Sequence, residues 1–209
     1  EYAVVADPYT GLNLPNRIER AEVVVKKGLP VAKTLDWVDL KFADDIQVPA
    51  DAWADWDAVE QRFITVGEKF PEGTTANVKV TVYYPPDLFQ QVKWHDGSPL
   101  SMGDFVIAMI MTFDPGKEGS PIFDEAQQPT VDNFLTHFKG VRIVSTDPLV
   151  IETYDDLFAL DAENNVSNVT TWWPYYTYGQ GPWHSLALGY LAEVNKELAF
   201  TTDKATALE

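Results

Sequence analysis

Alternation of apolar and polar residues predicts several strands in this chain. The clearest run covers residues 78–84, where every second residue is apolar: Val78, Val80, Val82 and Tyr84. A period of two is typical of a half-buried strand, and Pro85 and Pro86 end it because proline cannot donate to a strand ladder. Residues 21–31 predict a short strand followed by a turn, and residues 37–42 a second strand. Residues 140–156 predict a hairpin whose turn is Ser145-Thr146-Asp147-Pro148.

Helical spacing of apolar residues appears in three longer segments. In residues 102–113 it involves Met102, Phe105, Val106, Met109, Ile110 and Phe113. In the C-terminal segment 183–200 one helical face carries Leu186, Ala187, Tyr190, Leu191, Val194 and Leu198. Residues 48–64 place Trp53, Trp56, Val59, Phe63 and Ile64 near the same spacing. A shorter amphipathic turn or two is expected at 131–138, after a loop at 114–130.

Strands and helices therefore mix without a regular βαβ alternation, which favours the α+β class with a mixed sheet and a few helices. The chain has 209 residues, of which 45% are hydrophobic and 13% aromatic, and it can bury a core of its own. We expect residues 1–209 to form a single α+β lobe or subdomain.

Charge and cysteine content narrow the possible partners. The formal net charge is -17, which disfavours nucleic acid and anionic membrane surfaces as partners. The chain has no Cys, which excludes disulfides, thiolate zinc sites and cysteine nucleophiles. No apolar run is long enough to span a membrane. Since neither an initiating Met nor a signal peptide is seen, we interpret the chain as a fragment of a longer protein.

The segment Val92–Asp114 contains a neighbouring His and Asp, which raises the question of a catalytic pair. Residues 92–94 predict a short strand, and His95-Asp96-Gly97 a turn in which Gly97 takes a positive φ. Ser101 precedes Asp104 by three residues, which is the spacing of a helix N-terminal capping box. Adjacent residues in a turn point apart, so we interpret this segment as scaffold and expect no catalytic residues.

The same segment resembles the signature of the family 5 extracellular solute-binding proteins, the peptide- and nickel-binding group of ABC importers. The matching residues are Trp94, His95, Asp96, Gly97, Pro99, Leu100, Ser101 and Asp104. Residues 138–156, with Asp147 at a hairpin turn, are similar to the next feature of that family. From residue 92 to residue 156, the two segments span about a third of the chain. Met109 and Met111 depart from the small aliphatic residues usual in the signature helix.

This resemblance implies a non-enzymatic binding protein with the accessory lobe region of a type II periplasmic-binding-protein-like fold. It implies that the full-length protein is extracellular or periplasmic, anchored to the membrane by a lipid, and delivers a peptide or other small solute to an ABC permease. Members of the family have two large lobes that close on the ligand. The chain would then lack most of the cleft, and the rest of the protein would be a further partner.

An aromatic run supplies the candidate ligand-binding residues: Trp172, Trp173, Tyr175, Tyr176, Tyr178 and Trp183. Rings on a glycine- and proline-containing loop can stack on sugars or side chains. Alternatively, the loop folds over the core or packs against the remaining lobe. The same rings keep open a different class of function, an extracellular carbohydrate-binding or carbohydrate-hydrolysing enzyme that uses them as a platform for sugars.

Metal and cofactor sites are not expected. His95, His137 and His184 do not share metal-ligand spacing. The acidic groups Asp44-Asp45, Asp155-Asp156 and Asp161/Glu163 suit Ca²⁺ chemically, but none matches an EF-hand loop, and solvated surface explains them as well. The segments Asn165-Val166-Ser167 and Asn168-Val169-Thr170 fit the N-glycosylation pattern, which matters only in a eukaryotic secretory route.

Overall fold

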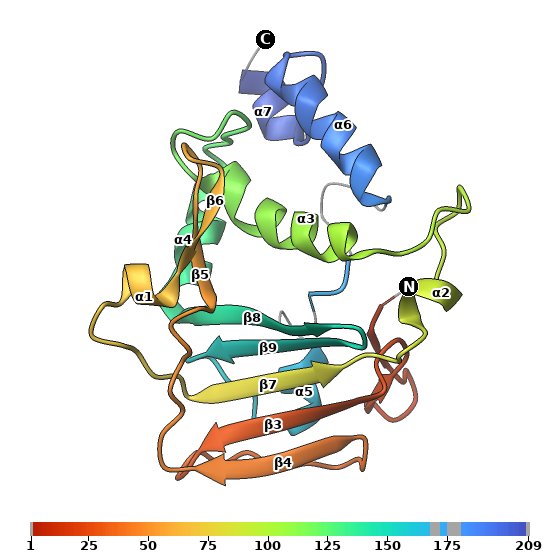
Figure 1. The fold of residues 1–209 in the computed structure, drawn as a ribbon, viewed down its shortest axis with the longest axis vertical. Coiled ribbons are helices and arrows are strands. Elements are labelled where there is room, and N and C mark those ends of the chain that lie inside the picture. Colours follow the sequence, from red (N-terminus) through yellow and green to blue (C-terminus); the bar gives the residue numbers. More distant parts are fainter. Residues whose placement is uncertain (1, 168–171, 175–180, 208–209) are drawn as a thin grey trace. The chain divides into compact units, whose positions relative to one another are not determined.

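The computed structural model describes residues 2–167, 172–174 and 181–207, and it confirms the α+β class (Figure 1). Seven strands form a mixed sheet in the order β4-β3-β7-β9-β8-β5-β6, and β1 and β2 form a separate pair. The chain divides into two compact units. Residues 1–55, 64–88 and 137–171 form the first, which we call the sheet unit. Residues 56–63, 89–136 and 172–209 form the second, the helical unit.

The strands are β1 Val4–Ala6, β2 Asn13–Pro15, β3 Arg20–Lys26, β4 Val38–Ala43, β5 Trp53–Asp57, β6 Arg62–Thr65, β7 Val78–Tyr83, β8 Phe138–Thr146 and β9 Leu149–Asp155. The α-helices are α1 Val66–Lys69, α2 Leu88–Gln91, α3 Met102–Phe113, α4 Gln128–His137, α5 Ala162–Ser167, α6 Trp183–Val194 and α7 Thr202–Ala207, and a 3-10 helix covers Asp114–Gly116. β3 runs parallel to β4 and antiparallel to β7, and β7, β9 and β8 pair antiparallel. The predicted strands at 21–31, 37–42 and 78–84 and the hairpin at 140–156 are confirmed.

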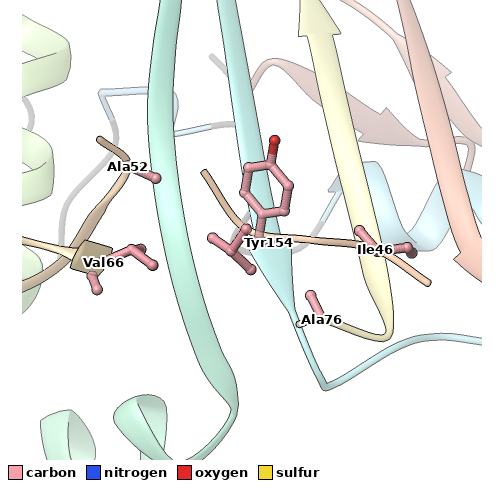
Figure 2. Close-up of a cluster of buried hydrophobic side chains, with 7 residues drawn as sticks. Ile46, Ala52, Val66, Ala76 and Tyr154 are labelled. Carbon is pink, nitrogen blue, oxygen red and sulfur yellow. The ribbon is translucent and has the colours of Figure 1, made fainter. Parts of the chain in front are cut away.

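The two faces of the sheet differ in chemistry. Cross-strand neighbours Val23 and Val80 are fully buried on one face, and α5 packs against β3, β4 and β7 (Figure 1). The opposite face carries ion pairs such as Lys79–Glu152, and part of it is covered by a buried apolar cluster. Figure 2 shows this cluster around the Tyr154 ring. Its members are Ile46, Val48, Ala52, Ala54, Val66, Ala76 and Tyr154.

The side chain of Asn165 anchors α5 to the chain that precedes it. Its Oδ1 accepts a hydrogen bond from the N–H of Ala159, and its Nδ2 donates to the carbonyls of Ala159 and Asp161 at 2.9 Å each. The residue is 5% exposed. The first predicted glycosylation site is therefore a structural amide and is closed to modification in the folded chain. Asn168 lies outside the described residues.

The helix predicted within residues 48–64 is wrong, because this segment contains β5 and β6. The central residues of β5, Ala54, Asp55 and Trp56, are all buried. A strand with both faces covered shows no alternation, which is why its aromatic spacing resembled a helix. The carboxylate of Asp57 accepts the N–H groups of Val59 and Glu60, which closes the turn between the two strands.

Four other expectations differ from the structure. The helix predicted at 131–138 begins three residues earlier, at Gln128, and the expected loop at 114–130 opens with a 3-10 helix. The predicted strand at 92–94 is reduced to a single bridge between Lys93 and Pro99. The helix α6 is present, but its apolar residues are not buried as one face: Leu186 is buried, whereas Leu191 is 55% exposed.

A buried carboxylate organises the interior of the helical unit beside the apolar face of α3. The fully buried Asp114 accepts hydrogen bonds from Trp56 Nε1 at 2.7 Å, Gln61 Nε2 at 3.2 Å and the Tyr190 hydroxyl at 3.0 Å. Burial raises the pKa of the Tyr190 hydroxyl, and the negative charge of Asp114 raises it further. Tyr190 is thus held as a neutral donor, and one acid links three separate segments of this unit.

Among the described residues, no helix combines the length and the apolar character needed to cross a membrane.

The amide of Asn165 gives a direct test of the α5 anchor. Asn165→Asp places a buried negative charge against the carbonyls of Ala159 and Asp161, and we expect it to lower the free energy of unfolding by about 3–5 kcal/mol. Chemical denaturation followed by circular dichroism measures this change. Asn164→Asp is the matched control, because that side chain is exposed, and its effect should stay near 0.5 kcal/mol. Equal effects of the two substitutions would contradict the anchor.

Candidate functional site

The signature segment begins with a tight turn in the helical unit. Gly97 has φ +85°, as predicted, and its N–H donates to the carbonyl of Trp94 at 3.0 Å. Asp96 Oδ1 accepts hydrogen bonds from the N–H of Ser98 at 2.9 Å and its hydroxyl at 2.6 Å. These bonds hold the pKa of the Asp96 carboxyl below its ordinary value, and His184 acts in the same direction. A left-handed glycine and an aspartate bonded to Ser98, two residues further along the chain, make the turn.

Helix α3 starts where the capping pattern predicted. Ser101 is the N-cap residue, and Asp104 Oδ2 accepts its N–H at 2.6 Å and its hydroxyl at 2.9 Å. The carboxylate of Asp104 lies in the first turn, where the positive end of the helix dipole stabilises it. The predicted cap is confirmed.

Asp104 has a second role that the sequence did not reveal. Its other oxygen, Oδ1, accepts the backbone N–H of Trp183 at 2.7 Å, which is at the start of α6 and 79 residues away in the chain. The first N–H groups of a helix have no partner within the helix. One carboxylate, 1% exposed, therefore satisfies the N-termini of α3 and α6 together. No local sequence pattern pairs residues so far apart.

The start of α6 presents an aromatic ring and an imidazole beside the signature turn. The Trp183 indole lies against Gly103, where an added Cβ would approach its ring atoms to 3.0 Å. Its side chain remains 46% exposed. Its ring meets the His184 ring edge to face, with centroids 5.7 Å apart. His184 Nε2 lies 3.5 Å from Asp96 Oδ2, so the imidazole that pairs with the signature aspartate is His184.

The other predicted ligand-binding residues are placed differently. Trp172 is 7% exposed and meets Phe134 edge to face, and Trp173 meets Phe105 in the same way, with ring centroids 6.4 Å and 5.8 Å apart respectively. These two rings pack within the helical unit, as the packing alternative for the aromatic run expects. Tyr175, Tyr176 and Tyr178 lie outside the described residues. Of the three described rings in this group, Trp183 offers the largest free surface.

Most of the remaining polar candidates have structural partners. His95 is exposed on the turn, while Asp44 pairs with Lys27 on the surface. Asp155 is buried and bonds His137 Nδ1 at 2.8 Å, and burial raises the pKa of its carboxyl. Over the described residues, no group of three or more His, Cys, Asp or Glu side chains could hold a metal ion. The absence of a cofactor stays a prediction.

The exposed groups at the start of α6 and at the signature turn are suited to binding a ligand. A half-exposed indole can stack on a ring or an aliphatic chain, and the neighbouring Asp96–His184 pair can exchange hydrogen bonds with a polar group. Below this surface, Gly103, Ser101 and Asp104 position the indole. Sequence reasoning singled out Trp183 and Asp96 separately, and it missed Gly103 as the contact of Trp183 and His184 as the partner of Asp96.

The double role of Asp104 predicts a large effect of its removal. Asp104→Ala leaves the donors of Ser101 and Trp183 without their acceptor, and we expect a loss of ~2–4 kcal/mol in the free energy of unfolding. Asp104→Asn keeps one acceptor oxygen and should lose about half of that. His95→Ala, an exposed change in the same segment, should alter it by no more than about 0.5 kcal/mol. Urea denaturation measures the free energy of unfolding of the three variants. A small effect of Asp104→Ala would contradict its bridging role.

Neither a protein-family model nor a curated protein sequence matches this chain.

Proposed function

We propose that the chain is part of an extracellular substrate-binding protein that delivers a small solute, such as a peptide, to an ABC permease. In this proposal it contributes the accessory lobe region of a periplasmic-binding-protein-like fold. The full-length protein is extracellular or periplasmic, anchored to the membrane by a lipid, and closes around its ligand with a remaining lobe. The observation that carries the proposal is the signature segment with its neighbouring ring: Trp94, His95, Asp96, Gly97, Ser101, Asp104 and Trp183.

Two features of this segment support a binding role, and the charge of the whole chain narrows the class of ligand. The turn and the cap are rigid, because their polar groups bond one another, as in Asp96 with Ser98 and Asp104 with Ser101. A rigid support reduces the entropy lost when a ligand binds. The ring held on that support is half exposed and uncharged, which suits a ligand with apolar parts. The net charge of -17 disfavours nucleic acid as the ligand.

The rival candidate is a carbohydrate-binding or carbohydrate-hydrolysing enzyme that uses the aromatic run as a platform for sugars. One observation favours it, the exposed indole of Trp183. Two observations weigh against it, since Trp172 is buried and Trp173 meets the buried Phe105 ring. A sugar platform needs ring faces that are open to the ligand. We therefore place solute binding first.

Native mass spectrometry of the full-length protein tests the proposal. A peptide or other small solute that co-purifies unchanged supports it. Release of a cleaved sugar from an oligosaccharide pool would replace it with the enzyme alternative.

A substitution at Trp183 tests the part of this proposal that concerns the site. If the indole contacts the solute, Trp183→Ala should weaken its binding by about 30-fold, the effect typical of a buried aromatic contact. Leu188→Ala is the matched control, because it truncates another exposed apolar residue of α6 and should leave affinity unchanged. Isothermal titration calorimetry of the full-length variants measures both. Equal affinities of the two variants would show that Trp183 does not contact the solute.

A further inference from the structure

Glu163, in α5 of the sheet unit, has a buried carboxylate whose two oxygens have unlike surroundings. The residue is 1% exposed. Its Oε1 accepts hydrogen bonds from the backbone N–H groups of Thr34, at 2.8 Å, and Leu35. Its Oε2 is buried and receives no hydrogen bond from any residue that the structure describes. A buried carboxylate oxygen without a donor is costly, so Oε2 requires a proton or a cation beside it.

The acid that can supply a proton is Asp161, immediately before α5. Its Oδ1 accepts the N–H of Asn164 at 2.9 Å, which places its carboxyl at the first turn of α5, and Glu163 is the second residue of that turn. Burial raises the pKa of Asp161, and the negative charge of Glu163 raises it further. Two carboxylates this close cannot both ionise without mutual repulsion.

The elements packed against α5 bring few other charges to this pair. α5 packs against β1, β2, β3, β4 and β7. β1 and β2 contain no ionisable side chain. The charged residues of the other three strands share the sheet face of Tyr154, opposite α5: Arg20, Glu22, Lys26, Asp39, Lys41 and Lys79.

The loop that binds Glu163 carries a charged pair of its own. Lys33 lies 3.4 Å from Asp36 and donates to the carbonyl of Val38, so its charge is already matched. On the neighbouring β9, the buried Asp155 is bonded to His137.

We propose that Asp161 and Glu163 share one proton, with Asp161 donating to Oε2 of Glu163, so that acidification tightens the attachment of α5 to the loop at Thr34 and Leu35. A proton explains the site better than a metal ion. Ca²⁺ takes six to eight oxygen ligands, whereas in the described part of the chain no group of three or more His, Cys, Asp or Glu side chains could hold a metal ion. The positive end of α5 also disfavours a cation there.

The direction of the pH dependence follows from this arrangement. A carboxyl whose pKa is higher in the folded state than in the unfolded state binds its proton more tightly when folded. The stabilising bond is therefore present at low pH and is lost as pH rises through the raised pKa of Asp161. Ordinary surface carboxylates, which pair with cations when folded, show the opposite trend.

Carboxyl-carbon NMR and amide hydrogen exchange on the whole chain test the proposal. The Asp161 carboxyl should titrate above the ordinary value of about 3.9. Across that titration, the protection of the Thr34 and Leu35 amides from exchange, corrected for the intrinsic rate, should rise ~5-fold on acidification, the effect of one added hydrogen bond. Asp161→Asn supplies an amide that can donate at every pH. In this variant the Thr34 and Leu35 amides should therefore be strongly protected at every pH.

The matched control is Asp44→Asn, which removes an exposed carboxylate from the same unit. It should leave the pH dependence at Thr34 and Leu35 unchanged, which separates the shared proton from general relief of negative charge. Ordinary titration of Asp161, or protection that does not depend on pH in the unsubstituted chain, would overturn the proposal. So would a rise in protection when CaCl₂ is added at neutral pH, because that result would assign the site to a cation.

Discussion

The carboxylate of Asp104 is the interaction on which the helical unit most depends. One oxygen receives the N–H and hydroxyl of Ser101, and the other receives the N–H of Trp183. Helix N-termini need acceptors for their first N–H groups, and a buried N-terminus cannot find them in water. By serving two helices with one side chain, the chain fixes where α6 begins relative to α3. The exposed ring of Trp183 is positioned as a consequence.

Buried carboxylates that accept several hydrogen bonds also occur elsewhere in each unit. Asp114 collects three donors in the helical unit, and Glu163 collects two backbone N–H groups in the sheet unit. Buried acids of this kind stabilise only when their oxygens are satisfied, and each is costly when a partner is removed. A chain with 32 acidic residues and 15 basic ones cannot pair every acid with a cation. Here the buried carboxylates accept hydrogen bonds from backbone N–H groups, hydroxyls, an amide and an indole.

Local patterns predicted local structure well. The alternation of residues 78–84, the positive φ of Gly97 and the cap at Ser101 each depend on neighbours within a few residues, and all three are confirmed. The hairpin at β5 and β6 was mistaken for a helix because burial of both faces of β5 removes the alternation.

Features that depend on distant residues were not predictable. The bond from Trp183 to Asp104 spans 79 positions, and the exposure of Leu191 depends on what packs around α6. The free oxygen of Glu163 likewise follows from how the loop at Thr34 meets α5. For the candidate site, the sequence supplied the turn, the cap and the list of aromatic residues. The structure alone separated the exposed Trp183 from the buried Trp172.

Hydrogen exchange at the single amide of Trp183 tests the central claim most directly. In the unsubstituted chain this amide should be protected from exchange, because it donates to a buried carboxylate. In Asp104→Ala it should exchange freely, while the amide of Val80 in the centre of the sheet stays protected. Equal protection of the Trp183 amide in both proteins would show that Asp104 does not join the two helices, and the account of the helical unit would fail.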